Sequence, residues 1–111
     1  MSSRSDDIKE MANLMGNAAM HRAIYGDAAF TIREAALYEG QAQKIADMRN
    51  WNDQELAQTA QRAKRDTRNL MKQRQDDWHG KSYDELCFLA DREIDKFIMR
   101  TKERKTKRKR K

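Results

Sequence analysis

Residues 50–56, NWNDQEL, mark the start of a helix more clearly than any other stretch of this chain. Asn52 is a good N-cap, and Glu55 stands three residues later, where a capping box needs it. Trp51 and Leu56 occupy the positions of a hydrophobic staple. This segment therefore predicts a helix over about residues 53–78, with a glycine just beyond its end.

A second capping box lies further along the chain, where Ser82 is followed by Glu85. Apolar residues recur behind it at helical spacing: Tyr83, Leu86, Ala90, Ile94, Phe97 and Ile98. The pattern predicts a last helix over about residues 83–101.

Two more helices are expected before residue 50. Ser5, followed by two aspartates, is the expected N-cap of a helix over about 5–25, which Gly26 ends. The next helix covers about 28–49 and begins at Asp27, or at Thr31 if TIRE is a capping box. Its apolar residues wrap more than half of its circumference: Phe30, Ile32, Ala35, Leu37, Tyr38, Ala42, Ile45, Ala46 and Met48. We therefore expect it to be the central, most buried helix.

The composition fits this pattern. Among 111 residues there are no prolines and four glycines, and 38% of the residues are charged. A sheet protein would need more turn residues and β-branched residues. We expect an all-α fold, a small four-helix bundle or paired helical hairpins over residues 1–100, with a disordered basic tail at 101–111. A three-helix body with one long bent element is the alternative.

The net charge of +6 is concentrated at one end of the chain. Residues 1–50 carry six Lys/Arg against seven Asp/Glu, and residues 51–100 carry ten of each. Residues 101–111, TKERKTKRKRK, carry eight against one, which gives +7. The body is therefore nearly neutral, and the excess of positive charge belongs to the tail.

Such a tail is typical of segments that bind the phosphate backbone of RNA or DNA. The residues expected to make contact are Lys102, Arg104, Lys105, Lys107, Arg108, Lys109, Arg110 and Lys111. The tail has no aromatic residue on which a base can stack, so it predicts binding without sequence preference. An import signal, or a tail for an acidic protein or membrane, has the same composition.

The expected third helix carries a second basic patch. Lys64, Arg65, Arg68 and Lys72 share a face about 100° wide. This face lies along a phosphate backbone, is simply solvated, or pairs with acids on a neighbouring helix. Trp51 and Trp78 bracket the helix, where each either stacks on a base or packs into the core.

No pattern of catalytic or metal-ligating residues is present. Neither His21 nor His79 belongs to a Glu-x-x-His motif, and Cys87 lies beside an apolar stripe, where a thiol acts as a small hydrophobe. A cluster of acids is expected on solvated faces rather than at a magnesium ion: Asp84, Glu85, Asp91, Glu93 and Asp95. With no glycine-rich phosphate loop either, we expect no enzyme activity, no metal and no cofactor.

Two apolar residues of the last helix, Phe88 and Met99, project away from its main stripe. They mark either a protein interface or a second buried layer. We expect a small accessory protein that binds nucleic acid within a ribonucleoprotein or nucleoid assembly. The alternative is a helical adaptor or homodimer that uses Phe88 and Met99. A single cysteine, no long apolar run and no signal-peptide opening favour an intracellular location.

Overall fold

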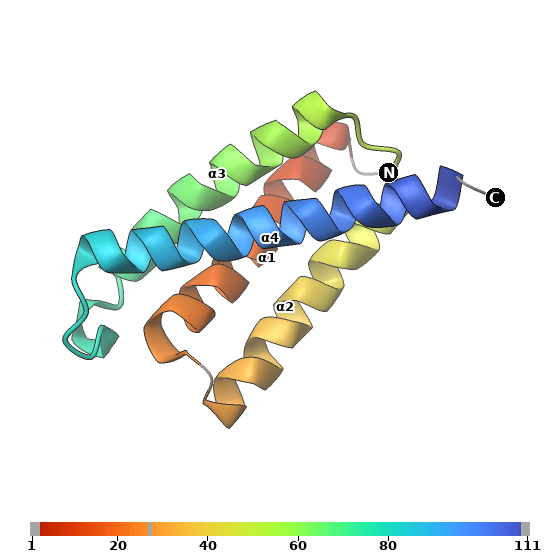
Figure 1. Ribbon diagram of the computed structural model, residues 1–111. Coiled ribbons are helices and arrows are strands. Elements are labelled where there is room, and N and C mark those ends of the chain that lie inside the picture. The colour runs from red at the N-terminus through yellow and green to blue at the C-terminus, as the bar shows by residue number, and fades with distance from the viewer. Residues whose placement is uncertain (1–2, 27, 110–111) are drawn as a thin grey trace.

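The computed structural model describes residues 3–26 and 28–109, with side chains up to Thr106, and four α-helices account for most of this length (Figure 1). The elements are α1 (Arg4–Tyr25), α2 (Ala29–Met48), α3 (Asp53–Lys72), the 3-10 helix η1 (Gln75–Asp77) and α4 (Tyr83–Lys109). The predicted all-α, four-helix fold is confirmed.

The central helix is α1, so the expectation that α2 would be the most buried helix is wrong. α1 packs against each of the other three helices, whereas α2 packs almost only against α1. α1 buries eight hydrophobic residues: Met11, Ala12, Met15, Ala18, Ala19, Met20, Ala23 and Ile24. α2 buries only Thr31, Ala35, Ala42 and Ala46, because its larger apolar residues point outward or lie at its edges.

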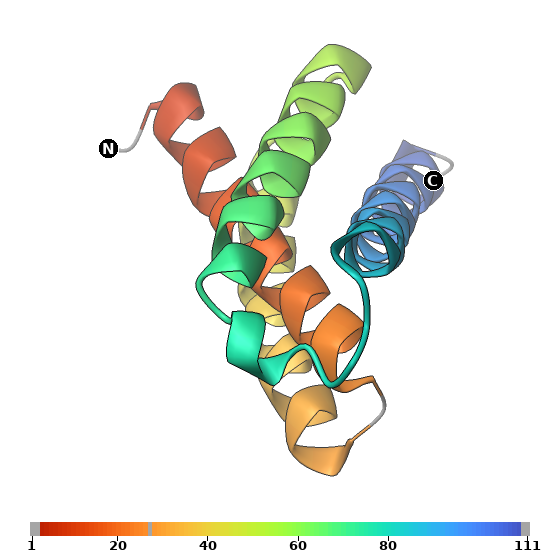
Figure 2. The same ribbon diagram turned by 90° about the vertical axis from the view of Figure 1, so that its left-hand side faces the viewer.

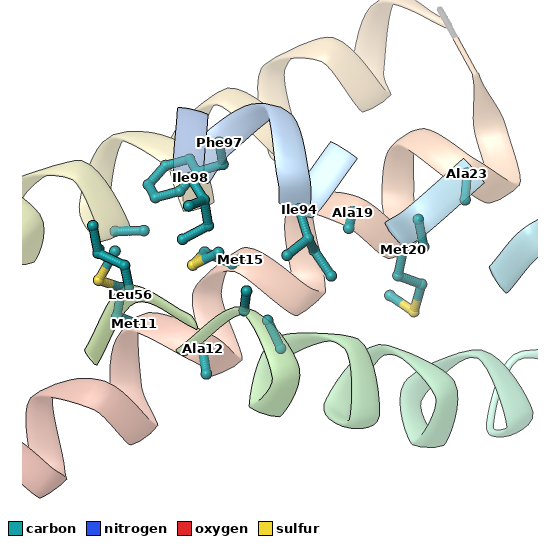
Figure 3. Packing of buried hydrophobic residues seen from close by; sticks show 14 of the residues in the cluster. Met11, Ala12, Met15, Ala19, Met20, Ala23, Leu56, Ile94, Phe97 and Ile98 are labelled. Atoms are coloured by element: carbon teal, nitrogen blue, oxygen red, sulfur yellow. The ribbon is translucent and has the colours of Figure 1, made fainter. Parts of the chain in front are cut away.

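The core lies between α1, α3 and α4. Figure 3 shows Phe97 and Ile98 of α4 close to Met15 of α1, with Leu56 of α3 beside Met11. Figure 2, in which α4 is seen almost end-on, places α4 on one side of α1 and α3. Burial of this apolar surface is the main stabilising term of such a fold.

Gly16 allows α1 and α3 to approach closely. A Cβ atom at this position would lie 3.1 Å from the Thr67 hydroxyl oxygen and 3.3 Å from the Ala63 carbonyl oxygen of α3. That hydroxyl donates to the Ala63 carbonyl at 2.6 Å, so the polar atom is satisfied inside the contact.

The two predicted start signals in the second half of the chain are confirmed. The Glu55 backbone N–H donates to Asn52 Oδ1 at 2.8 Å, and Glu55 Oε1 accepts from the Asn52 backbone N–H at 3.1 Å. The Ser82 hydroxyl oxygen accepts from the Glu85 backbone N–H at 3.1 Å. Both caps satisfy backbone donors that the first turn of a helix leaves without partners.

The starts of the first two helices differ from expectation. Ser3, and not Ser5, caps α1 and accepts from the Asp6 backbone N–H at 3.1 Å. α2 begins after Ala28 without any side-chain cap, and Thr31 is buried inside its first turn. The predicted capping box at Thr31 is therefore not the start of α2, and Asp27 lies outside the described residues.

α3 ends at Lys72, before the predicted end near residue 78. The chain turns back beyond this point, and Trp78 Nε1 donates to the Met71 carbonyl oxygen at 2.9 Å. His79 and Gly80 both have a positive φ, of 54° and 79°. A right-handed helix requires negative φ, so it cannot continue through these two residues.

α4 continues to Lys109, past the end expected near residue 101. The predicted disordered tail is therefore wrong for the backbone of residues 101–109. No glycine or proline interrupts this segment, and positive side chains near a helix C-terminus offset the negative end of its dipole. Residues 110 and 111 lie outside the described residues.

Candidate nucleic-acid interface

The basic end of α4 is anchored to the body by the burial of Thr101 and by two contacts with other segments. Thr101 is buried, and its hydroxyl donates to the Phe97 carbonyl oxygen at 3.0 Å. Arg104 Nη2 lies 2.7 Å from Asp47 Oδ2 at the end of α2. Lys105 Nζ donates to the backbone carbonyl of Trp51. Two of the predicted nucleic-acid ligands, Arg104 and Lys105, thus also hold the helix in place.

A depression of about 220 Å³ lies beneath this anchor, between the end of α2 and the end of α4. Of the charged residues that line it, Asp47, Arg104 and Arg49 form ion pairs, and Lys105 donates to a backbone carbonyl. Arg4 binds Glu55 through two contacts of 2.6 and 2.9 Å, and Arg49 pairs with Asp7. The hydrogen bond from Arg4, aided by the Asn52 backbone N–H, lowers the pKa of Glu55 to about 2. The excess of positive charge therefore begins beyond this point, along α4.

The remaining basic residues of this segment follow the same helix. Lys102 is exposed, and no ion pair of Lys102 is formed within the described part of the chain. Lys107, Arg108 and Lys109 continue the backbone of α4. Arg110 and Lys111 lie outside the described residues. In the sequence, this part of α4 carries more cations for its length than any other helix of the chain.

The basic patch of α3 has a different setting. Lys64 Nζ lies 2.9 Å from Asp95 Oδ1, and Arg68 Nη2 lies 3.1 Å from Asp91 Oδ2. Lys72 lies over the ring of Tyr83, with Nζ 5.7 Å from the ring centroid. Three of the four predicted residues therefore face α4, where two of them form ion pairs.

Arg65 is the exception on α3. Its side chain is exposed and lines a shallow depression with Arg62 and residues of the first turns of α1. The structure therefore divides the four predicted cations of α3 between two surfaces, and it places neither of them next to the end of α4.

The two tryptophans are packed against the protein. Trp51 is 2% exposed and belongs to the same core cluster as Leu56, in keeping with the staple. Trp78 is half-buried against that cluster. Of the two readings of each tryptophan, the core role is the one that the structure shows.

Phe88 and Met99 lie on the outer face of α4, 62% and 61% exposed. The guanidinium carbon of Arg92 lies 5.7 Å from the centroid of the Phe88 ring and covers part of it. The predicted second buried layer is absent from the described residues at this face. Both residues are thus available to a partner.

The histidines and the cysteine, whose side chains could serve in catalysis or metal binding, lie against other side chains of the protein. The rings of His21 and Tyr38 lie 5.6 Å apart, and those of His79 and Tyr25 lie 5.8 Å apart. Cys87 is half-buried beside the core. Over the residues that the structure describes, histidine, cysteine and acidic side chains form no group of three or more able to hold a metal ion.

Acids on a neighbouring helix are one expected set of partners for the α3 cations, but sequence reasoning did not identify them, although the signal was present. Lys64 and Arg68 are four residues apart, and so are Asp91 and Asp95. Residues four apart lie on the same face of a helix, and neighbouring antiparallel helices bring such pairs together in reverse order. The anchors at Asp47 and Trp51 have no comparable signal, because they depend on where α2 ends.

Comparison with protein-family models, with curated proteins and with solved structures finds no match for this chain. Among the described helices, none combines the length and the apolar character needed to span a bilayer. The feature of this chain that points to a function is the positive charge at the end of α4.

Proposed function

We propose that this protein is a small, non-catalytic, intracellular accessory protein that binds the phosphate backbone of RNA or DNA. The observation that carries the proposal is the excess of positive charge on one end of α4. Residues 101–111 carry +7, while two of the four cations of the α3 patch, Lys64 and Arg68, are matched by acids of α4. Charge of this kind gives affinity through release of counterions, without base recognition.

A basic segment that is already helical should bind more tightly than a flexible tail with the same sequence. Ordering a backbone costs about 1–2 kcal/mol for each residue, and residues 101–109 are already helical in the free chain. Because phosphates line both sides of a groove between nucleic-acid strands, such a groove suits a helix end with this density of positive charge. Such binding fits a component or associate of a ribonucleoprotein or nucleoid assembly.

The structure indicates where to shorten the chain in a test. Ending it at residue 100 would remove the buried Thr101 and the contacts of Arg104 and Lys105. A chain that ends at Thr106 keeps these anchors and lacks five cations. We expect it to bind an unrelated RNA hairpin and a DNA duplex about 100-fold more weakly than the full chain near physiological salt.

The matched control is a full chain in which Lys64 and Arg68 are replaced by glutamine. It lacks cations that already have partners, so its affinity should stay within about threefold of the original. Fluorescence anisotropy measures both. Equal affinities of the full and shortened chains, or no binding by the full chain beyond that of a free peptide of residues 101–111, would reject the proposal.

A second candidate function is supported by the exposure of Phe88 and Met99. Isolated exposed apolar residues are common, but these two lie on one face of α4. A helical adaptor would bury them against another protein. Phe88→Glu or Met99→Glu would then abolish partner binding in pull-down experiments at any salt concentration, while nucleic-acid affinity would be unchanged.

A further inference from the structure

α2 lies at one edge of the bundle, with the rest of the molecule on one side of it (Figure 1). Its outer side carries three large apolar residues, which are far from buried: Phe30, Leu37 and Met48 are 58%, 62% and 80% exposed. Exposed apolar residues that gather on one helix face mark a contact surface more strongly than scattered ones.

These residues belong to a continuous seam along α2. Its six members are Phe30, Glu34, Leu37, Gln41, Lys44 and Met48, and all six are exposed. Their spacing alternates between four and three residues, which is the spacing of a coiled-coil seam. They fall within an arc of about 80° and span about 27 Å of the helix. We call this set the α2 seam.

The α2 seam is complementary to itself when it is reversed. In an antiparallel pair centred on residue 39, Phe30 faces the partner's Met48, Glu34 faces the partner's Lys44, and Leu37 faces the partner's Gln41. By symmetry each contact occurs twice. We propose that α2 pairs with α2 of a second copy of this chain in this antiparallel register and forms a two-fold symmetric dimer.

The charges determine the direction of the pair. A parallel arrangement would place Glu34 against the partner's Glu34 and Lys44 against the partner's Lys44, so that like charges would oppose one another. Within the described residues, neither Glu34 nor Lys44 forms an ion pair. Both charges are thus free to pair across the interface.

The outer face of α4 is the competing surface for a second copy. It carries two large apolar residues, Phe88 and Met99, against three on the α2 seam. Its Asp95 is already paired with Lys64. The α2 seam therefore offers more apolar area and fewer charges that are in use.

The proposed dimer does not depend on nucleic-acid binding. It does determine where the basic ends of the two α4 helices lie relative to each other. Arg104 of α4 pairs with Asp47 at the end of α2, so the end of α4 lies close to the end of α2. In an antiparallel pair these two ends lie on opposite sides of the two-fold axis. A dimer would therefore present its two basic helix ends far apart.

The test measures mass in solution by sedimentation equilibrium on protein freed of nucleic acid, at 0.15 M salt. The full chain should rise with concentration from its monomer mass of 13.1 kDa towards twice that value. Leu37→Glu should remain a monomer. Glu34→Lys should raise the dissociation constant of the dimer roughly tenfold, and adding Lys44→Glu to it should restore the original value.

The matched controls are Phe88→Glu and Met99→Glu on α4, which should leave self-association unchanged. Because all of these residues are exposed, circular dichroism should show the same helix content in every variant. A full chain that stays at 13.1 kDa at millimolar concentration overturns the proposal. So does loss of the dimer in the α4 variants alone, or failure of the double charge exchange to restore it.

Discussion

The cations of α3 and the cations at the end of α4 have the same chemistry but different surroundings. On α3, Lys64 and Arg68 lie within 2.9 and 3.1 Å of acids that α4 supplies. At the end of α4, Arg104 and Lys105 contact the body, and the positive charge that follows them along the sequence is not balanced by acids in that segment. Positive charge alone therefore does not identify a binding surface, because its partners within the chain decide whether it is available.

The largest expected effect is on nucleic-acid affinity. Replacing Lys107, Arg108, Lys109, Arg110 and Lys111 by glutamine should weaken duplex binding about 100-fold near physiological salt. Replacing the four cations of α3 by glutamine should weaken it less than about threefold, because Asp91 and Asp95 neutralise two of them and none of the four lies next to the end of α4. Equal losses in the two variants would show that α3 belongs to the interface.

The next effect is on stability. Replacing both Asp91 and Asp95 by lysine exchanges two ion pairs for two repulsive contacts, which should lower the free energy of unfolding by roughly 2 kcal/mol. Urea denaturation at low salt measures this change. Glu103→Lys, the same charge reversal at an exposed position nearer the end of α4, is the control and should change stability by less than about 0.5 kcal/mol. Equal losses of stability in the two variants would show that the ion pairs of the α3 cations do not stabilise the fold.

A milder change of the same acids should turn the paired cations of α3 into cations that are available to a ligand. Asp91→Asn with Asp95→Asn leaves Lys64 and Arg68 without their carboxylates but adds no repulsion. These cations then become available to phosphate, and duplex affinity should rise several-fold, with up to about two more counterions released. Unchanged affinity in a salt titration would mean that α3 cannot reach the nucleic acid at all.

The smallest effect concerns the paired charges next to the basic end of α4. Because the pKa of Glu55 is lowered to about 2 from its ordinary value of 4.5, its ion pair with Arg4 contributes fully above pH 4.5. The contribution is lost as the pH falls from 4.5 to about 2. Glu55→Gln should therefore destabilise slightly at pH 7 and not at pH 2. Equal destabilisation at both values would assign the loss to the capping box.

Much of the fold was readable from the sequence. The caps at Asn52 and Ser82 are local devices: the full capping box forms at Asn52, and Ser82 accepts from the Glu85 backbone N–H as predicted. The rank of the helices by burial was not readable from the number of apolar residues. α1 is central because Gly16 and its many alanines admit neighbours closely, whereas Phe30 and Leu37 of α2 face outward.

The candidate site was predicted in part. The basic residues are visible in the sequence, but their availability depends on long-range pairing, which the spacing of Asp91 and Asp95 indicates for α3 and nothing indicates for the contacts of Arg104 and Lys105. The extension of α4 to Lys109 was missed because eight cations in eleven residues predict repulsion and disorder. Contacts with Asp47 and Trp51, which are more than 50 residues away in the sequence, hold this segment as a helix.

The most direct test of the account is the salt dependence of duplex binding. Arg104 and Lys105 are held by their contacts with the body, so six cations of residues 101–111 remain for the nucleic acid. The logarithm of the binding constant should therefore fall with the logarithm of the salt concentration with a slope of about −5. The chain that ends at Thr106 should give a slope of about −1. Equal slopes for the two chains would contradict the account, because the charge beyond Thr106 would then not be the charge that binds.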